Sequence, residues 1–231
     1  MPSPEASYCS EDPIAEIHRY GLDLQFDQIY LMGSDEYISH EMEDEPGIEF
    51  SMAGHFIKNL NILMSRNTDP ILIHMKTCGG YWEEGMAIYD AIASCPNKTT
   101  ILNYNHARSM SSIIFQAANK RVMMPHSTFM FHEGDVAFSG TPKMLRSFHS
   151  QEAVALDIML DIYAESMKKK GKMSKSRPDT IRRWLVTQMD KKEDVFLSAK
   201  EAVEYGFADE VFGANGKYDR KALTVFDKEK D

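Results

Sequence analysis

Apolar and polar residues alternate along this chain in short blocks, each about as long as one strand or one helix. Compact apolar runs predict buried strands, and apolar residues at helical spacing predict helices between them. The strands are expected at 28–32, 71–75, 99–104, 122–124 and 129–131. The helices between them are expected around 56–63, 86–92 and 111–118. From residue 70 onward the order is βαβαββ, which favours an α/β fold with a largely parallel sheet.

The pattern becomes helical after the last of these strands. Thr141-Pro142 suits the start of a long helix, because threonine caps helices and proline is favoured at the first helical position. Gly171 is expected to end this helix, and a second helix is expected at 181–189. Ser198–Glu201 has the sequence of a capping box, and the short helix that it starts is expected to stop at Gly206.

The two ends of the chain differ in composition from its middle. Residues 1–19 begin with a polar, proline-containing stretch and are expected to form a mobile N-terminal arm. Residues 214–231 are polar and charged and are expected to form a C-terminal tail. The segment 41–49 holds five carboxylates around a Pro-Gly pair, which indicates an exposed acidic loop or a helix start. Residues 20–213 then form one domain, without repeats.

Composition narrows the possible partners of the protein. The 231 residues include 35 acidic and 26 basic ones, a net charge of −9, which repels a phosphate backbone and argues against nucleic acid as a partner. Cys9, Cys78 and Cys95 form no CxxC pair, so neither a disulfide framework nor a metal site is expected. No apolar run approaches the roughly 18 residues of a membrane helix, and no signal peptide is visible. We therefore expect a cytoplasmic protein that does not bind membranes.

Three residues are candidates for a catalytic role. Ser109 lies where the strand at 99–104 passes into an apolar helix, a position that exposes a serine beside free backbone N–H groups. His132 ends a strand of the α/β pattern, and Asp194 precedes another apolar run. Taken singly, however, Ser109 reads more simply as a helix cap, His132 as a structural histidine, and Asp194 as an ordinary surface carboxylate.

Their sequence context resembles a family in which all three have a role. Residues 79–90 resemble a glycine pair followed by a G-x-x-I-Y-D helix, and residues 107–110 resemble a nucleophile turn. Residues 125–132 are similar to a strand written P-N-S-x-x-M-I-H. Residues 194–199 resemble the aspartate segment, and 201–209 resemble the closing motif E-A-x-E-Y-G-L-x-D. These motifs, in this order, are those of ClpP, the proteolytic subunit of the Clp protease.

The resemblance implies a fold and a site. The fold would be the ClpP/crotonase-like superhelix of β-β-α repeats with a protruding handle helix, and the domain at 20–213 would be a protease. Ser109 would be the nucleophile of a serine endopeptidase, His132 its general base, and Asp194 (rather than Asp190) the group that orients the histidine. The backbone N–H groups of Gly80 and Met110 would form the oxyanion hole, and no cofactor or metal would be needed.

The resemblance also implies partners. Members of the family assemble into heptameric rings, which can stack in pairs through the handle helix and enclose the sites in a chamber. Substrates would be peptides or unfolded proteins, and an AAA+ unfoldase would be a partner that delivers folded ones.

Departures from the family pattern leave alternatives open. Cys78 replaces the proline before the glycine pair, Arg108 replaces a small residue before the nucleophile, and Glu133-Gly134 replaces Gln-Pro after the histidine. The stretch between Gly140 and Asp194 is longer than usual, and the basic segment 168–177 is expected to hold the excess as a solvated connection. One alternative is a non-catalytic ring subunit. Another is a crotonase-type acyl-CoA enzyme, which uses a backbone oxyanion hole without a serine nucleophile.

Overall fold

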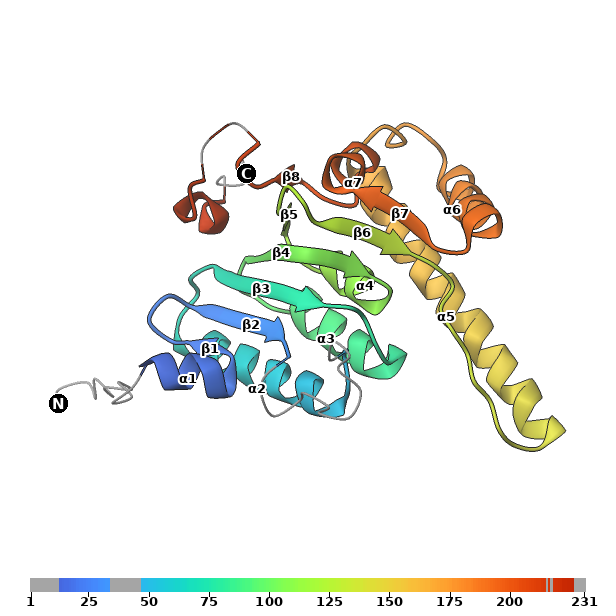
Figure 1. The fold of residues 1–231 in the computed structure, drawn as a ribbon, viewed down its shortest axis with the longest axis horizontal. Coiled ribbons are helices and arrows are strands. Elements are labelled where there is room, and N and C mark those ends of the chain that lie inside the picture. The colour runs from blue at the N-terminus through green and yellow to red at the C-terminus, as the bar shows by residue number, and fades with distance from the viewer. Residues whose placement is uncertain (1–12, 34–46, 215, 217, 227–231) are drawn as a thin grey trace.

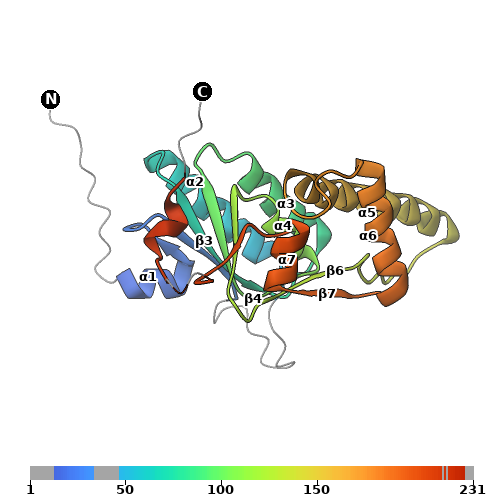
Figure 2. The ribbon, with the colours of Figure 1, turned by 90° about the horizontal axis from the view of Figure 1, so that it is seen from above.

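The fold is built around one twisted sheet, from which a long helix projects (Figure 1). The structure is a computed structural model, and it describes residues 13–33, 47–214, 216 and 218–226. Helices α1 and α5 lie at opposite ends of the molecule in both Figure 1 and Figure 2. None of the helices in these ranges combines the length and the hydropathy that crossing a membrane requires.

The sheet is largely parallel, as the strand and helix order predicts. Strands β2 to β5 pair in parallel in sequence order, β1 pairs antiparallel with β2, and β8 joins β5. Strand β6 runs parallel to β4 and antiparallel to β7. The strands are β1 (Leu22–Asp23), β2 (Gln28–Met32), β3 (Ile71–Thr77), β4 (Thr99–Arg108), β5 (Lys120–Met123), β6 (Thr128–Phe131), β7 (Val195–Ser198) and β8 (Glu210–Val211).

Helices cover one face of this sheet and form the main core with it. Successive side chains of a strand point to opposite faces, so Ile71 and Ile73 face the helices whereas Leu72 faces away. The helices are α1 (Pro13–Tyr20), α2 (Phe50–Arg66), α3 (Trp82–Ala93), α4 (Met110–Phe115), α5 (Pro142–Lys169), α6 (Pro178–Lys192), α7 (Ala199–Tyr205) and the 3₁₀ helix η1 (Lys221–Thr224).

Strand β4 is longer than the sequence predicts. The sequence predicts a strand that ends at residue 104, but residues 105–108 continue it up to the residue before Ser109. The strand changes neighbour along its length: residues 100–103 pair with β5, and residues 106–108 pair with β6. Two successive partners keep the backbone of this polar segment hydrogen-bonded, and this overrides its loop-like composition.

Helix α5 starts as its sequence predicts and extends beyond the sheet. The Thr141 side chain accepts a hydrogen bond from Met144 N at 3.3 Å, and Pro142 occupies the first turn. The helix has 28 residues, and its C-terminal half packs into the core through Met159 and Tyr163. Its N-terminal half projects away from the body (Figure 1), which matches the handle helix that the family resemblance implies.

The two ends are more ordered than their composition indicates. Residues 1–12 of the expected arm lie outside the described residues, and the chain after them forms helix α1. In the expected tail, Leu223 is 1% exposed and packs against the sheet face opposite the main core. The Thr100 hydroxyl donates to the Leu223 carbonyl at 2.6 Å. Part of the tail is therefore packed against the domain rather than solvated.

The acidic segment 41–49 divides into two parts. Residues 41–46 lie outside the described residues. Glu49 caps helix α2, because its carboxylate accepts hydrogen bonds from Ser51 N at 2.8 Å and Met52 N at 2.6 Å. The described part of the acidic segment therefore leads into a helix start, one of the two structures that its composition indicates.

A buried histidine lies on the sheet face opposite the main core. His74 is 2% exposed and stacks on Tyr30 with a ring-centroid distance of 4.6 Å. Its Nε2 donates to Gln28 Oε1 at 2.7 Å, and Nδ1 accepts from the Tyr104 hydroxyl at 2.9 Å. Burial lowers the pKa of His74 to about 4, and the charge of Arg220 lowers it further than Asp23 raises it. The fold therefore holds this imidazole in its neutral form.

This histidine predicts a loss of stability in mild acid. Between pH 6.5 and about 4, the unfolded chain binds a proton at position 74 that the folded chain excludes. The contribution is complete above pH 6.5, and the free energy of unfolding should fall by up to about 3 kcal/mol as the pH drops through this window. His74→Gln should show a flatter profile in urea unfolding measured across the window. Equal slopes for the two proteins would contradict the prediction.

Candidate active site

Ser109 occupies a sharp turn between β4 and α4. Its backbone angles, φ 51° and ψ −133°, are rare for a residue other than glycine. Ser109 N donates to Met130 O at 3.2 Å, which ties the turn to β6. A strained turn of this kind persists only where the surrounding structure holds it in place. Such turns cluster at functional sites. The turn leaves the Ser109 side chain half-buried at the end of the sheet.

Two glycines allow the segment after β3 to pass close to its neighbours. A Cβ on Gly79 would lie 2.7 Å from Ser109 Cβ, and a Cβ on Gly80 would lie 2.2 Å from Ile48 O. Both glycines have positive φ angles, 106° and 148°. Gly79 can therefore lie against the Ser109 turn, and Gly80 against Ile48, only because neither has a side chain.

His132 follows β6 directly and reaches Ser109. Met130 pairs with Arg108 in the β4–β6 ladder, so the residues just after these two strands come together. His132 Nε2 lies 2.9 Å from Ser109 Oγ. The imidazole side chain is 16% exposed, so it is largely shielded from water.

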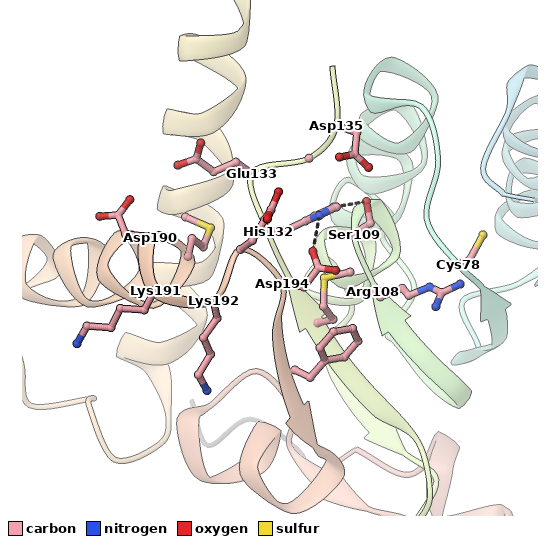
Figure 3. Close-up of a pocket in the computed structure, with 15 residues that line it drawn as sticks. Cys78, Arg108, Ser109, His132, Glu133, Asp135, Asp190, Lys191, Lys192 and Asp194 are labelled. Atoms are coloured by element: carbon pink, nitrogen blue, oxygen red, sulfur yellow. Dashed lines mark hydrogen bonds and ion pairs between the residues drawn. The ribbon is translucent and has the colours of Figure 1, made fainter. Parts of the chain in front are cut away.

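Asp194 stands on the other side of the imidazole. Helix α6 is followed by Glu193, whose φ of 59° turns the chain towards β7, and Phe131 pairs with Val195 in the β6–β7 ladder. Asp194 Oδ1 lies 3.0 Å from His132 Nδ1 (Figure 3), and its side chain is 46% exposed. Because the carboxylate accepts a hydrogen bond from Nδ1–H, Nε2 is left to accept one from the Ser109 hydroxyl.

The structure thus brings together the three residues that the sequence singled out. Asp190 lines the same groove from α6, but the hydrogen bond from His132 within the described residues goes to Asp194. Met110 is the first residue of α4, where backbone N–H groups have no acceptor within the helix. Gly80 lines the adjoining hollow together with Met110 and Ser109.

A hydrogen-bonded link from Ser109 to α5 was not foreseen. The Ser112 hydroxyl donates to Ser109 O at 2.6 Å and accepts from the Tyr163 hydroxyl at 2.6 Å. Burial raises the pKa of Tyr163, which therefore stays protonated as the donor. Ser112 and Tyr163 are 51 positions apart, and no sequence motif relates them. The hydrogen bond between them is therefore visible only in the structure.

Two hollows meet at the Ser109–His132 pair. The first, of about 980 Å³, is named the charged groove. It contains Cys78 and Arg108 on one side of Ser109 and the end of α6, with Lys191 and Lys192, on the other (Figure 3). The second, of about 440 Å³, lies between α3, α4 and α5 and is named the helix pocket. An extended ligand could thus contact both hollows while passing Ser109.

Comparisons with known proteins agree on one family. The family model described as Clp protease matches residues 39–215. The "ATP-dependent Clp protease proteolytic subunit 2" of Pseudomonas aeruginosa is 29% identical over 168 residues, which cover 71% of this chain and 77% of that protein. The "ATP-dependent Clp protease proteolytic subunit" of Deinococcus radiodurans is also 29% identical, over 71% of this chain and 76% of its own length.

A solved structure shows the same fold. A mutant of ClpP1 from Listeria monocytogenes superposes with a TM-score of 0.65, covering 86% of this chain and 95% of that one. Its sequence identity to this chain is 20%, so this likeness concerns the fold alone.

The geometry predicts that the reactivity of Ser109 depends on Asp194 more strongly than on Asp190. Asp194→Asn should slow the reaction of Ser109 with a fluorophosphonate probe by about a hundredfold or more, because the imidazole loses the carboxylate that fixes its tautomer. Asp190→Asn is the matched control, since it removes a carboxylate from the same groove without touching His132. Labelling rates can be followed by mass spectrometry, and a larger effect from Asp190→Asn would place the orienting carboxylate elsewhere.

Proposed function

Because this chain belongs to the Clp protease family, we propose that it is a serine endopeptidase that hydrolyses peptides and unfolded proteins. The observation that carries the proposal is the row of hydrogen bonds from Ser109 Oγ through His132 to Asp194, at 2.9 and 3.0 Å. A hydroxyl, an imidazole and a carboxylate in this order form the arrangement that activates serine for acyl transfer.

The acylation step uses the three side chains in sequence. Ser109 Oγ forms a bond to the carbonyl carbon of the scissile peptide while its proton moves to His132 Nε2. The carbon–nitrogen bond then breaks, and the proton passes to the leaving amine, so that an ester remains on Ser109. Asp194 stabilises the imidazolium that exists between these two transfers.

Hydrolysis of the ester restores the enzyme. Water attacks the ester carbon as His132 takes its proton, and that proton returns to Ser109 Oγ as the acid product leaves. In both steps the negative charge on the carbonyl oxygen would be held by the N–H groups of Gly80 and Met110, which lie beside Ser109. The route needs no metal or organic cofactor, because the chain supplies the nucleophile, base and oxyanion donors.

Removing the nucleophile tests this proposal. Ser109→Ala should lower hydrolysis of a fluorogenic peptide by about a thousandfold or more and abolish fluorophosphonate labelling. Ser65→Ala, an exposed serine on α2, is the control and should retain both activities. Peptide turnover that survives Ser109→Ala would overturn the assignment. A native chain with neither turnover nor labelling would be a non-catalytic subunit, and thioesterase activity independent of Ser109 would indicate a crotonase-type enzyme.

We also propose that the working form is a heptameric ring, single or doubled, with the sites inside its chamber. Helix α5 supports assembly, because it exposes apolar side chains that one chain leaves in water: Met144 (55%), Leu145 (49%), Val154 (50%) and Ile158 (38%). A chamber would exclude folded proteins, so an AAA+ unfoldase would be a partner, as the "ATP-dependent" names of the relatives suggest. Membership of the family supports a cytoplasmic location for this work.

Charges on the exposed face of α5 should weaken assembly. Leu145→Glu with Val154→Glu should shift the population towards smaller species, because burying a carboxylate in an apolar interface is unfavourable. Ser150→Glu adds a charge to the same helix at an exposed polar position and should leave assembly largely intact. Native mass spectrometry can count the subunits. A native chain that is active only as a monomer would defeat the ring.

A further inference from the structure

We propose that the helix pocket binds a lysine or arginine side chain of the substrate, on the residue whose carbonyl Ser109 attacks. The inference rests on the proposed function and adds a substrate preference to it. Three properties of the pocket support it: its position beside the reacting atoms, its apolar floor, and the single sign of the charges at its rim.

The position of the pocket selects which substrate residue can enter it. Ser109, Gly80 and Met110 all line it, so it adjoins the nucleophile and both candidate oxyanion donors. Gly80 and Met110 do not line the charged groove, which instead extends from Ser109 towards α6. The side chain on the α-carbon that is bonded to the attacked carbonyl carbon lies nearest to those donors, so it enters the helix pocket.

The floor of the pocket suits a long aliphatic stem. Met110 and Ile113 of α4 and Met159 of α5 are each below 5% exposed, and Ala155 and Leu156 complete the apolar side. The methylene groups of lysine or arginine can cover such a surface while the charged end remains near water. An apolar residue would use the same floor, so the rim must supply any discrimination.

The rim carries negative charge only. Four carboxylates line the pocket, and no lysine or arginine does: Glu83 on α3, Glu133 and Asp135 after β6, and Glu152 on α5. Within the described part of the chain, none of the ion pairs between side chains involves these four residues. Glu152 is half-buried, which strengthens its interaction with a cation compared with a fully exposed carboxylate.

The two hollows differ in the signs of their charges. The charged groove contains the cations Arg108, Lys191 and Lys192, but it also contains five carboxylates: Glu133, Asp135, Asp190, Glu193 and Asp194. In the helix pocket, by contrast, a basic side chain would meet carboxylates alone. The single sign of charge therefore favours a substrate held with its basic residue between α3 and α5.

Peptides that differ at one residue test this preference on the assembled, full-length protein. Three fluorogenic peptides would carry lysine, norleucine or glutamate on the carbonyl side of the bond, since norleucine keeps the stem and lacks the charge. We expect kcat/KM to be about five- to tenfold higher for lysine than for norleucine, and lowest for glutamate. The lysine preference should shrink in 0.5 M salt, because salt screens the carboxylates.

Substitutions at the rim identify the residues responsible. Glu83→Gln with Glu152→Gln should bring the lysine-to-norleucine ratio of kcat/KM close to one, because these two carboxylates line the helix pocket and not the charged groove. Glu84→Gln is the matched control, because Glu84 neighbours Glu83 on α3 but does not line the pocket. Thermal melts would show that each variant folds.

The outcomes separate this inference from the proposed function. Equal or faster cleavage of the norleucine peptide by the native chain would overturn the preference while leaving the endopeptidase proposal intact. A lysine preference undiminished by the double rim substitution would also overturn it, since Glu83 and Glu152, the two carboxylates that line this pocket alone, would not be its source. Failure of all three peptides together with absent fluorophosphonate labelling would instead contradict the proposed function itself.

Discussion

The close approach of two backbone segments is the constraint on which the site depends. The chain leaving β3 passes so near the Ser109 turn that a side chain at Gly79 would overlap Ser109 Cβ, and one at Gly80 would overlap Ile48. The strained angles of Ser109 persist because β6 and this glycine segment confine the turn from two sides. The missing proline at Cys78 is therefore tolerable, since the glycines, not the residue before them, determine the approach.

The sequence predicted the elements that depend on neighbouring residues. It missed the features that depend on contacts between segments far apart in the chain. Apolar runs located the strands, and the capping residues Thr141 and Ser198 located two helix starts. Residues 105–108 were misread, because their strand conformation comes from pairing with two successive neighbours. The three candidate site residues followed from family motifs in order. Their distances depend on the β4–β6 and β6–β7 registers, and the hydrogen bond between Ser112 and Tyr163 depends on how α4 and α5 pack. A sequence pattern contains neither.

The core behind the site joins it to the projecting helix. Phe131, the residue before His132, lies within 5.6 to 5.8 Å of Phe207 and Tyr163, measured between ring centroids. Tyr163 belongs to α5 and also supports the Ser109 carbonyl through Ser112. Tyr163 of α5 therefore contacts the groups next to both His132 and Ser109. The helix that exposes the apolar residues proposed for assembly is thus also part of the scaffold of the site.

The wide spacing of the site along the chain has a consequence during protein synthesis. Ser109 and His132 are 23 residues apart, but Asp194 follows His132 by a further 62, and it is set in place by β7. A ribosome therefore synthesises Ser109 and His132 well before it synthesises Asp194. A nascent chain of this protein therefore lacks the carboxylate partner of His132 until most of its domain has emerged. Under the proposed function, the order of translation itself would delay the activation of Ser109.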